Sequence, residues 1–279
     1  MSERVLIAGC GDLGLRVAQL LLARGDEVFA LRRHPPVEDD SSITWLCADL
    51  TRADTLSNLP PGITQLIYSP APSAREQAGY RDVFVEGMQH LLVALDKVAL
   101  QRVLFVSSSA VYGEHGDDWV DETTPPAPLG FNGNILLEAE QWLLAQPLPS
   151  VVLRLAGIYG PGRMQWVEHL RAGQMQAPRV PRHWANRIHV DDAAAAIVHL
   201  LDLRDPQHVY LGVDDTPHPL DELYGYLAAL IGAPAVKEGP GPTAVGSKRL
   251  SNARLRASGF RCRWPDARDG YAAAVKDRS

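Results

Sequence analysis

A glycine-rich turn directly after the first apolar run is the feature that most constrains this chain. The run Arg4–Ala8 is short and apolar, and residues 9–14 follow it with G-x-G-x-x-G spacing. Leu13–Ala23 then repeats apolar residues at helical spacing, so the sequence predicts a strand–turn–helix unit. In such a unit the first glycine permits a tight turn, the second lets the backbone approach a pyrophosphate, and the third lets the helix pack on the strand.

The start of the predicted helix adds N–H groups and positive potential for phosphates. The sequence therefore predicts a dinucleotide site, and the alternative is an ordinary strand–helix turn that is rich in glycine. The predicted cofactor-binding residues of the turn are Gly9, Gly11, Asp12, Leu13 and Gly14.

The second predicted strand, Glu27–Leu31, is followed by basic residues. A site selective for NAD places a carboxylate there to bind the ribose 2′-hydroxyl. This chain has Arg32 and Arg33 instead, and its next carboxylate is Glu38. Because a guanidinium can hold a 2′-phosphate bidentately, we predict NADP as the cofactor, with NAD as the alternative. The simpler interpretation is that both arginines are solvated loop charges.

Short apolar runs alternate with helical patterns along the chain. Further strands are predicted at Ile43–Cys47, Gln65–Tyr68, Arg102–Val106 and Ser150–Leu155, and helices at Gln77–Val98, Ile135–Ala145 and Val190–Leu201. This alternation predicts an α/β fold of the NAD(P)-binding Rossmann type, with a doubly wound parallel sheet. We expect a dinucleotide-binding core over residues 1–159, completed by a helix over 190–205. A smaller substrate-binding lobe is expected over 160–189 and 206–279.

Charge and cysteine content limit the classes of partner. The 279 residues carry a formal net charge of −6 and no basic run longer than a pair, which argues against a nucleic-acid partner. Cys10, Cys47 and Cys262 are odd in number and lack metal-ligand spacing, so we expect neither a disulfide framework nor a metal site. No apolar stretch approaches the ~20 residues that span a bilayer. We therefore expect a cytoplasmic protein that acts on a small molecule.

Four further segments resemble the extended short-chain dehydrogenase/reductases, also called the NAD-dependent epimerase/dehydratase family. They are Cys47–Leu50, Phe105–Gly113, Leu153–Gly162 and Ile188–Asp192. The likeness covers essentially the whole chain, and the small bacterial members called YeeZ-like look nearest. It implies that Asp49 contacts the adenine amino group and that Leu50 and Ser107 also border the cofactor. It further implies a substrate such as a sugar nucleotide, and a homodimer formed through helices beside the sheet.

The same resemblance reveals a gap in the expected chemistry. The family uses Tyr-x-x-x-Lys, in which the phenol moves the proton that accompanies hydride transfer and the lysine lowers the phenol pKa. Placing Glu140 on the family's usual glutamate puts Asn132 at the tyrosine and Leu136 at the lysine. A shift of one residue restores neither. Phe84 also stands where the family has the asparagine that supports the proton relay.

Three residues near the predicted end of the fifth strand are candidates for proton transfer. Ser108 occupies the family's Ser/Thr position and is expected to contact a substrate oxygen, or else to satisfy loop backbone. Tyr112 is expected to form a wall of the pocket, with proton donation as the alternative. His115 is a candidate because the histidine side chain is the one suited to proton transfer near neutral pH, and the simpler interpretation is a solvated loop histidine.

Several charged residues call for partners. Arg154 lies in a predicted buried strand, so it should face a carboxylate or phosphate. Asp191 or Asp192 is expected to cap the helix that follows. Arg187 and His189 are candidates to face the ligand. Arg163 and Arg249 could grip an anionic group or form surface salt bridges, and Cys10 is expected to be a small buried filler.

Two classes of function fit these observations. The first is an atypical NADP(H)-dependent oxidoreductase or epimerase-like enzyme that takes its proton from Ser108, His115 or water. The second is a regulatory protein that senses NADP(H) without turnover, because such a protein would keep the glycine turn and lose the relay.

Overall fold

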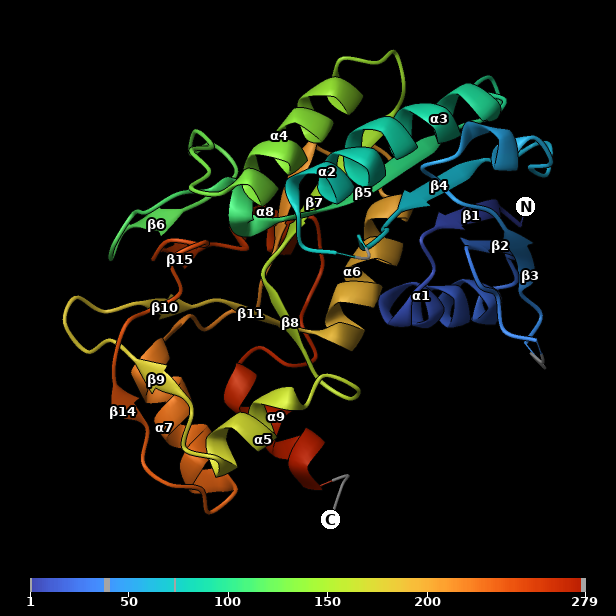
Figure 1. Cartoon of the computed structure of the whole chain (residues 1–279). Helices are drawn as coiled ribbons and strands as arrows, with labels where there is room; N and C mark the ends of the chain where they lie inside the picture. The colour runs from blue at the N-terminus through green and yellow to red at the C-terminus, as the bar shows by residue number, and fades with distance from the viewer. Residues whose placement is uncertain (1, 38–40, 73, 277–279) are drawn as a thin grey trace. The chain divides into compact units, whose positions relative to one another are not determined.

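The computed structural model describes residues 2–37, 41–72 and 74–276 (Figure 1). Its main feature is a parallel seven-stranded sheet in the order β12-β7-β5-β4-β1-β2-β3. The strands are β1 (Arg4–Ala8), β2 (Glu27–Arg32), β3 (Thr44–Cys47), β4 (Gln65–Tyr68), β5 (Arg102–Ser108), β7 (Ser150–Leu155) and β12 (Val209–Gly212). Strand β1 pairs with β2 on one side and with β4 on the other, so Val5 lies between Val28 and Gln65. The prediction of a doubly wound α/β Rossmann fold is confirmed.

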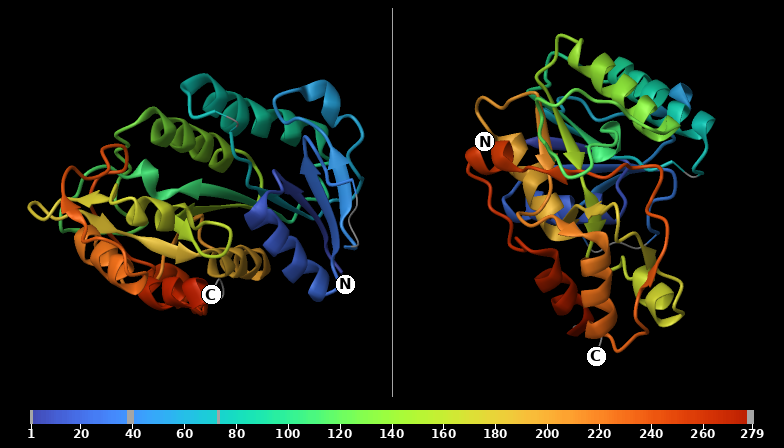
Figure 2. Two further views of the ribbon diagram at one scale, coloured as in Figure 1. Left: turned by 60° about the horizontal axis from the view of Figure 1, so that its bottom comes forward. Right: turned by 90° about the vertical axis from the view of Figure 1, so that its left-hand side faces the viewer.

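Helices cover both faces of this sheet (Figures 1 and 2). One face carries α1 (Asp12–Ala23) and residues 194–202 of α6 (Val190–Asp202). The other carries α2 (Gln77–Arg81), a π-helical turn (Asp82–Glu86), α3 (Gly87–Ala94) and α4 (Phe131–Leu144). The side chains of Val5, Leu6, Ile7 and Ala8 in β1 are buried between them, which is why this part of the strand appears in the sequence as a continuous apolar run.

Two of the predicted helices differ from the observed ones. The helix expected over Gln77–Val98 ends at Ala94, because Leu95 takes an extended conformation with φ −83° and ψ 146°. The helix expected from Ile135 begins at Phe131. Its first turn includes Gly133 and Asn134, two poor helix formers, so tertiary packing decides where it begins.

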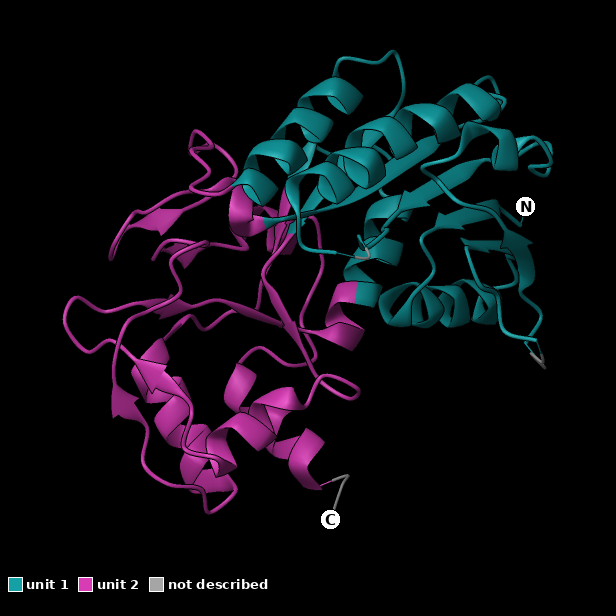
Figure 3. Cartoon of the chain, viewed as in Figure 1, with its two compact units in different colours: residues 1–108, 131–154, 194–209 teal, residues 109–130, 155–193, 210–279 magenta. Residues whose placement is uncertain are grey.

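The chain divides into two compact units (Figure 3). Unit 1 comprises residues 1–108, 131–154 and 194–209, and unit 2 comprises 109–130, 155–193 and 210–279. The sequence also leads us to expect a core that binds the dinucleotide and a lobe that binds the substrate. This division is defined by function, and it stays a prediction. None of the helices formed by the described residues has the length and apolar character needed to cross a membrane.

Unit 2 is built from short strands and helices. The strands are β6 (Trp119–Val120), β8 (Gly157–Tyr159), β9 (Gln176–Ala177), β10 (Trp184–Ala185), β11 (Arg187–His189), β13 (His218–Pro219), β14 (Lys237–Glu238) and β15 (Arg249–Leu250). The helices are α5 (Gln165–Arg171), α7 (Leu220–Leu230), α8 (Ala253–Ala257) and α9 (Ala267–Lys276). Strand β11 pairs in parallel with β8, and β15 with β6. Tyr159, Leu170, Leu223, Leu227 and Tyr271 belong to the core of this unit.

Candidate functional site

The turn between β1 and α1 has the geometry that a bound pyrophosphate needs. Gly9 has φ +84°, and a Cβ atom there would lie 2.3 Å from Cα of Pro70, so only glycine fits. The N–H groups of Gly9 and Cys10 donate to the Leu31 carbonyl at 3.0 and 3.1 Å, which ties the turn to β2. A Cβ atom at Gly11 would meet no atom within 4 Å. Among the described residues, no side chain caps α1 at Gly11, and the open space there adjoins a helix start suited to phosphate.

The third glycine of the turn closes the helix onto the strand. A Cβ atom at Gly14 would lie 3.1 Å from Sγ of Cys10 and 3.3 Å from Cγ2 of Ile7. Cys10 is buried, as expected for a small filler. Leu13 is buried beside it, while the exposed Asp12 approaches Arg16 with 3.4 Å between Oδ1 and Nε.

The two predicted phosphate-binding arginines lie at the carboxyl end of β2. Arg32 ends the strand, is half-buried, and has its guanidinium carbon 5.9 Å from the ring centroid of Trp45. Arg33 follows on the exposed side of the loop. Glu38, the next carboxylate in the sequence, lies outside the described residues. A cation held on a tryptophan face is oriented in advance, which suits recognition of a phosphate group.

The predicted adenine contact lies after the neighbouring strand, β3. One carboxylate oxygen of Asp49, Oδ1, accepts hydrogen bonds from the backbone N–H and the hydroxyl of Thr51, at 3.0 and 2.8 Å. The next residue, Leu50, is buried. The carboxylate is thus fixed in one orientation at the edge of the sheet where this architecture binds ligands.

A buried polar cluster joins β5, α4 and β7. The Ser107 hydroxyl donates to Oε1 of Glu140, and the Arg154 guanidinium donates to Oε2 of Glu140 from Nε at 3.0 Å and from Nη2 at 2.6 Å. All three side chains are buried. The predicted need of Arg154 for a carboxylate partner is confirmed. In the sequence, Glu140 is only one of two glutamates in this helix, and the fold identifies it as the partner of Arg154.

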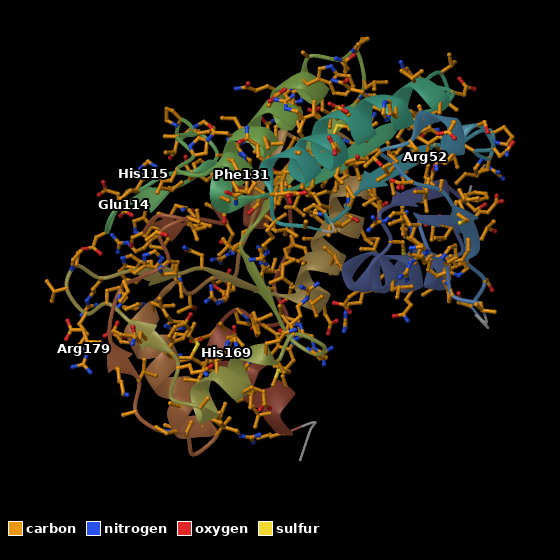
Figure 4. The ribbon with its side chains drawn as sticks, in the orientation of Figure 1. Arg52, Glu114, His115, Phe131, His169 and Arg179 are labelled. Carbon is orange, nitrogen blue, oxygen red and sulfur yellow. The ribbon has the colours of Figure 1, made fainter. Side chains whose placement is uncertain are left out.

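Apolar and aromatic side chains surround the start of α4. Phe131 begins the helix (Figure 4), and its ring meets that of Tyr80 with centroids 5.4 Å apart. Tyr80 packs on Phe84 at 5.4 Å, and Phe84 on Phe105 at 6.2 Å. Leu136, at the register position of the family's lysine, is buried with 4% of its surface exposed.

The candidate proton-transfer residues have different surroundings. Ser108 ends β5 and is half-buried. Tyr112 is fully buried, and its hydroxyl donates to the carbonyl of Asp121 at 2.9 Å. Its phenol is therefore a structural donor in this arrangement. His115 lies in the loop before β6 (Figure 4), where its Nε2 atom is buried and has no hydrogen-bond partner within the described parts of the chain.

Lys248 is a buried residue that sequence reasoning missed. Its ammonium donates to the carbonyls of Tyr112 and Gly113, both at 3.4 Å, to that of Gly246 at 3.3 Å, and to that of Val245. Burial lowers the pKa of this lysine to about 8, although the charge of Glu114 opposes the shift. Within unit 2, Lys248 anchors the loop that follows Tyr112. In the sequence it resembles a surface charge in a loop rich in Pro and Gly.

His189 and Asp192 have different roles at the start of α6, whose first turn contains both expected acids, Asp191 and Asp192. The Nδ1 atom of His189 accepts a hydrogen bond from the N–H of Asp191 at 3.2 Å. The Asp192 carboxylate accepts instead from the N–H groups of Arg263 and Trp264, at 2.8 and 2.9 Å. His189 thus contributes to the helix start, and Asp192 holds a distant segment of unit 2.

Arg249 is held by aromatic rings. Its guanidinium carbon lies 5.0 Å from the ring centroid of Trp119 and 5.1 Å from that of Trp184. It also donates to the carbonyl of Asp117. This stacking replaces the surface salt bridge that the sequence suggested.

Comparisons with known proteins place these features in context. A family model described as "NAD dependent epimerase/dehydratase family" matches residues 5–212. Protein YeeZ of Escherichia coli K12 is 30% identical over 243 residues, which cover 82% of this chain and 84% of YeeZ. The 3-diazoavenalumate denitrifying reductase of a Streptomyces species is 25% identical over 96% of this chain and 98% of its own. A solved Methylobacillus flagellatus structure, proposed to be an NAD-dependent epimerase/dehydratase, is 39% identical with a TM-score of 0.83, covering 100% of this chain and 99% of that one.

Proposed function

The chain belongs to the NAD-dependent epimerase/dehydratase family, and from that premise we propose that it is an NADP(H)-dependent oxidoreductase that works without a Tyr-x-x-x-Lys pair. The observation that carries the proposal is the turn at Gly9, where φ is +84° and Pro70 leaves no room for a side chain. Together with the open space at Gly11, this geometry fits the backbone approach that a dinucleotide pyrophosphate requires. Hydride transfer is the chemistry that a bound nicotinamide supplies.

The selectivity for NADP is proposed to come from the end of β2. Arg32 would bind the 2′-phosphate with its guanidinium held over Trp45, and Arg33 would add a second positive charge. Asp49 would contact the adenine, because its carboxylate is already oriented by Thr51.

The proton that accompanies hydride transfer would come from Ser108, His115 or water. A reductase direction is favoured by the Streptomyces relative, which is named as a reductase and aligns along nearly the whole chain. The substrate would be a small molecule, and sugar nucleotides are one class to test because a solved neighbour of the same fold, MoeE5, is in complex with UDP-glucuronic acid and NAD.

A second candidate is a protein that binds NADP(H) and signals its redox state without turnover. The observation that favours it is the apolar surroundings of α4. Leu136 is buried where the family has a lysine, and Phe84 packs between Tyr80 and Phe105. Neither Leu136 nor Phe84 carries an ionisable group that could move a proton.

The experiment measures binding and turnover separately. Calorimetric titration with NADPH and NADH is expected to show tighter binding of NADPH. Oxidation of NADPH is then followed at 340 nm with panels of carbonyl compounds, diazo compounds and sugar nucleotides. Turnover on any panel supports the oxidoreductase. Tight NADPH binding without turnover on any panel supports the sensor, and NADH binding tighter than NADPH would overturn the assignment of NADP.

A further inference from the structure

The side chain of Arg187 fills the space above a glycine on the neighbouring strand. Strands β11 and β8 run in parallel, and Arg187 is paired with Gly157. A Cβ atom built on Gly157 would lie only 2.8 Å from Nη1 of Arg187 and 3.5 Å from its Cδ. A side chain at Gly157 would therefore displace the guanidinium of Arg187 from its present position.

Among the described residues, no carboxylate lies within ion-pair distance of this guanidinium. The acid that interacts with it is Asp214, which is 1% exposed and whose Oδ2 has no hydrogen-bond partner among the described residues. Burial raises the pKa of Asp214 to about 8 even though Arg187 opposes this shift. Burial therefore favours the neutral form of this acid, which weakens its electrostatic compensation of Arg187.

The other neighbours of Arg187 are neutral. Nη1 donates to the carbonyl of Asn186 at 3.1 Å, and the side chain also hydrogen-bonds to Tyr271. The ring of Tyr271 stacks on that of Tyr159 with centroids 4.2 Å apart, which makes a rigid aromatic support. A guanidinium has five N–H donors, so these two acceptors leave donors for a bound molecule.

A half-buried cation without a carboxylate costs free energy unless an anion arrives to pair with it. The position of Gly157 in the chain is suited to binding such an anion, because Gly157 comes two residues after the end of β7. The carboxyl ends of parallel strands are where this architecture binds its ligands. We propose that Arg187 binds the anionic group, a carboxylate or a phosphate, of the substrate, with Gly157 as the residue that makes room for its guanidinium.

This inference rests on the proposed function, since it names the class of molecule that the oxidoreductase would take. It makes Arg187 a residue that determines specificity through a fixed, planar pair of donors. Carboxylates and phosphates both match that geometry. Neutral analogues of the same shape would leave the cation unpaired and should bind less well.

The test uses three probes on the whole chain saturated with NADPH, at constant ionic strength. The probes are benzoate, its neutral analogue benzamide, and inorganic phosphate, each titrated by calorimetry. The variant Arg187→Gln removes the charge, and Arg187→Lys keeps the charge without the planar fork. Arg179→Gln, an exposed arginine of the same unit (Figure 4), is the matched control.

We expect Arg187→Gln to weaken binding of benzoate or phosphate at least 10-fold, Arg187→Lys to weaken it less, and Arg179→Gln to leave it unchanged. Whichever of benzoate and phosphate shows the loss identifies the anionic group. Benzamide affinity should not change. Equal anion affinity in the natural protein and in Arg187→Lys and Arg187→Gln overturns the inference. If Arg187→Gln does not fold, Arg187→Met is titrated in its place, and anion affinity equal to that of the natural protein in this uncharged variant overturns the inference.

The NADPH titration separates this inference from the proposed function. We expect NADPH affinity to be unchanged in Arg187→Gln, because the cofactor residues belong to unit 1 and Arg187 to unit 2. Failure of the natural protein to bind NADPH defeats the proposed function alone, since anion binding at Arg187 can still be measured without cofactor.

Discussion

The guanidinium of Arg154 donates to Oε2 of Glu140 twice, from Nε at 3.0 Å and from Nη2 at 2.6 Å. The hydroxyl of Ser107 donates to the other carboxylate oxygen, Oε1. Removing these charges from water is costly, and the paired geometry offsets that cost only while both partners are present. The cluster therefore holds β5, α4 and β7 in one arrangement, and Ser108 directly follows one of its members.

Replacing Glu140 with glutamine should leave Arg154 buried without its counter-charge. We expect Glu140→Gln to lower the free energy of unfolding by about 3–5 kcal/mol, as is typical when one partner of a buried pair is lost. Urea denaturation followed by circular dichroism measures this change. Glu138→Gln is the control on the same helix, because Glu138 pairs with Arg81 and both side chains are 44% exposed. Glu138→Gln should lower the free energy of unfolding by less than about 1 kcal/mol. Similar losses in Glu138→Gln and Glu140→Gln would contradict the buried-pair argument.

Two glycines of the first turn should respond differently to the same substitution. Gly9→Ala places a Cβ atom 2.3 Å from Pro70 and forces a strained φ, so we expect loss of stability and of NADPH binding together. Gly11→Ala meets no protein atom within 4 Å, so we expect normal stability with NADPH binding weakened about 10-fold or more, because the methyl group enters the space of the pyrophosphate. Thermal denaturation and calorimetry separate the two effects. Unchanged NADPH affinity in Gly11→Ala would exclude this turn as the pyrophosphate site.

The long strands of the sheet could be predicted because each is an apolar run between turns. Arg4–Ala8 and Ser150–Leu155 were predicted with the bounds that the structure shows. The strands of unit 2 could not be predicted, because two or three residues are too few to show alternation. The start of α4 at Phe131 was missed for another reason, since Gly133 favours a loop locally and packing overrides it.

The candidate site shows the same contrast between local and distant determinants. The turn at Gly9 is a local feature, so its spacing in the sequence is sufficient to find it. The partner of Arg154 could be expected, but only the fold shows that it is Glu140. Lys248 could not be predicted, because its acceptors are backbone carbonyls from two separate segments and carry no signature in the side chains.

Arg32 should control the choice between the two nicotinamide dinucleotides. Loss of a charge-assisted contact costs about 1.5–3 kcal/mol, so Arg32→Ala should weaken NADPH binding roughly 10- to 100-fold and leave NADH nearly unchanged. Arg52→Ala is the control, because Arg52 is exposed and paired with Asp54 (Figure 4). Calorimetric titration of Arg32→Ala and Arg52→Ala with NADPH and with NADH measures the ratio of the two cofactor affinities. An equal loss for NADPH and NADH would mean that Arg32 does not contact the 2′-phosphate.

The buried carboxyl of Asp214 should make stability depend on pH. Burial raises its pKa from 3.8 to about 8, and the nearby charge of Asp266 adds to the shift. Between these two values the folded chain holds a proton at Asp214 that the unfolded chain has released. The free energy of unfolding from this group therefore falls as pH rises through that window, by up to about 1.4 kcal/mol per pH unit, and levels off above the folded pKa.

Asp214→Asn removes this proton and keeps an acceptor for the Thr216 N–H, which donates to Oδ1 at 3.2 Å. We expect the variant to equal the natural protein near pH 4 and to become progressively more stable than it up to pH 8. Urea denaturation at one-unit pH intervals measures the difference. Asp215→Asn is the matched control, because Asp215 is less buried and lies 3.9 Å from the guanidinium of Arg256. A constant difference between the natural protein and Asp214→Asn from pH 4 to 8 would show that Asp214 does not carry this proton, and the cation of Arg187 would then already be compensated.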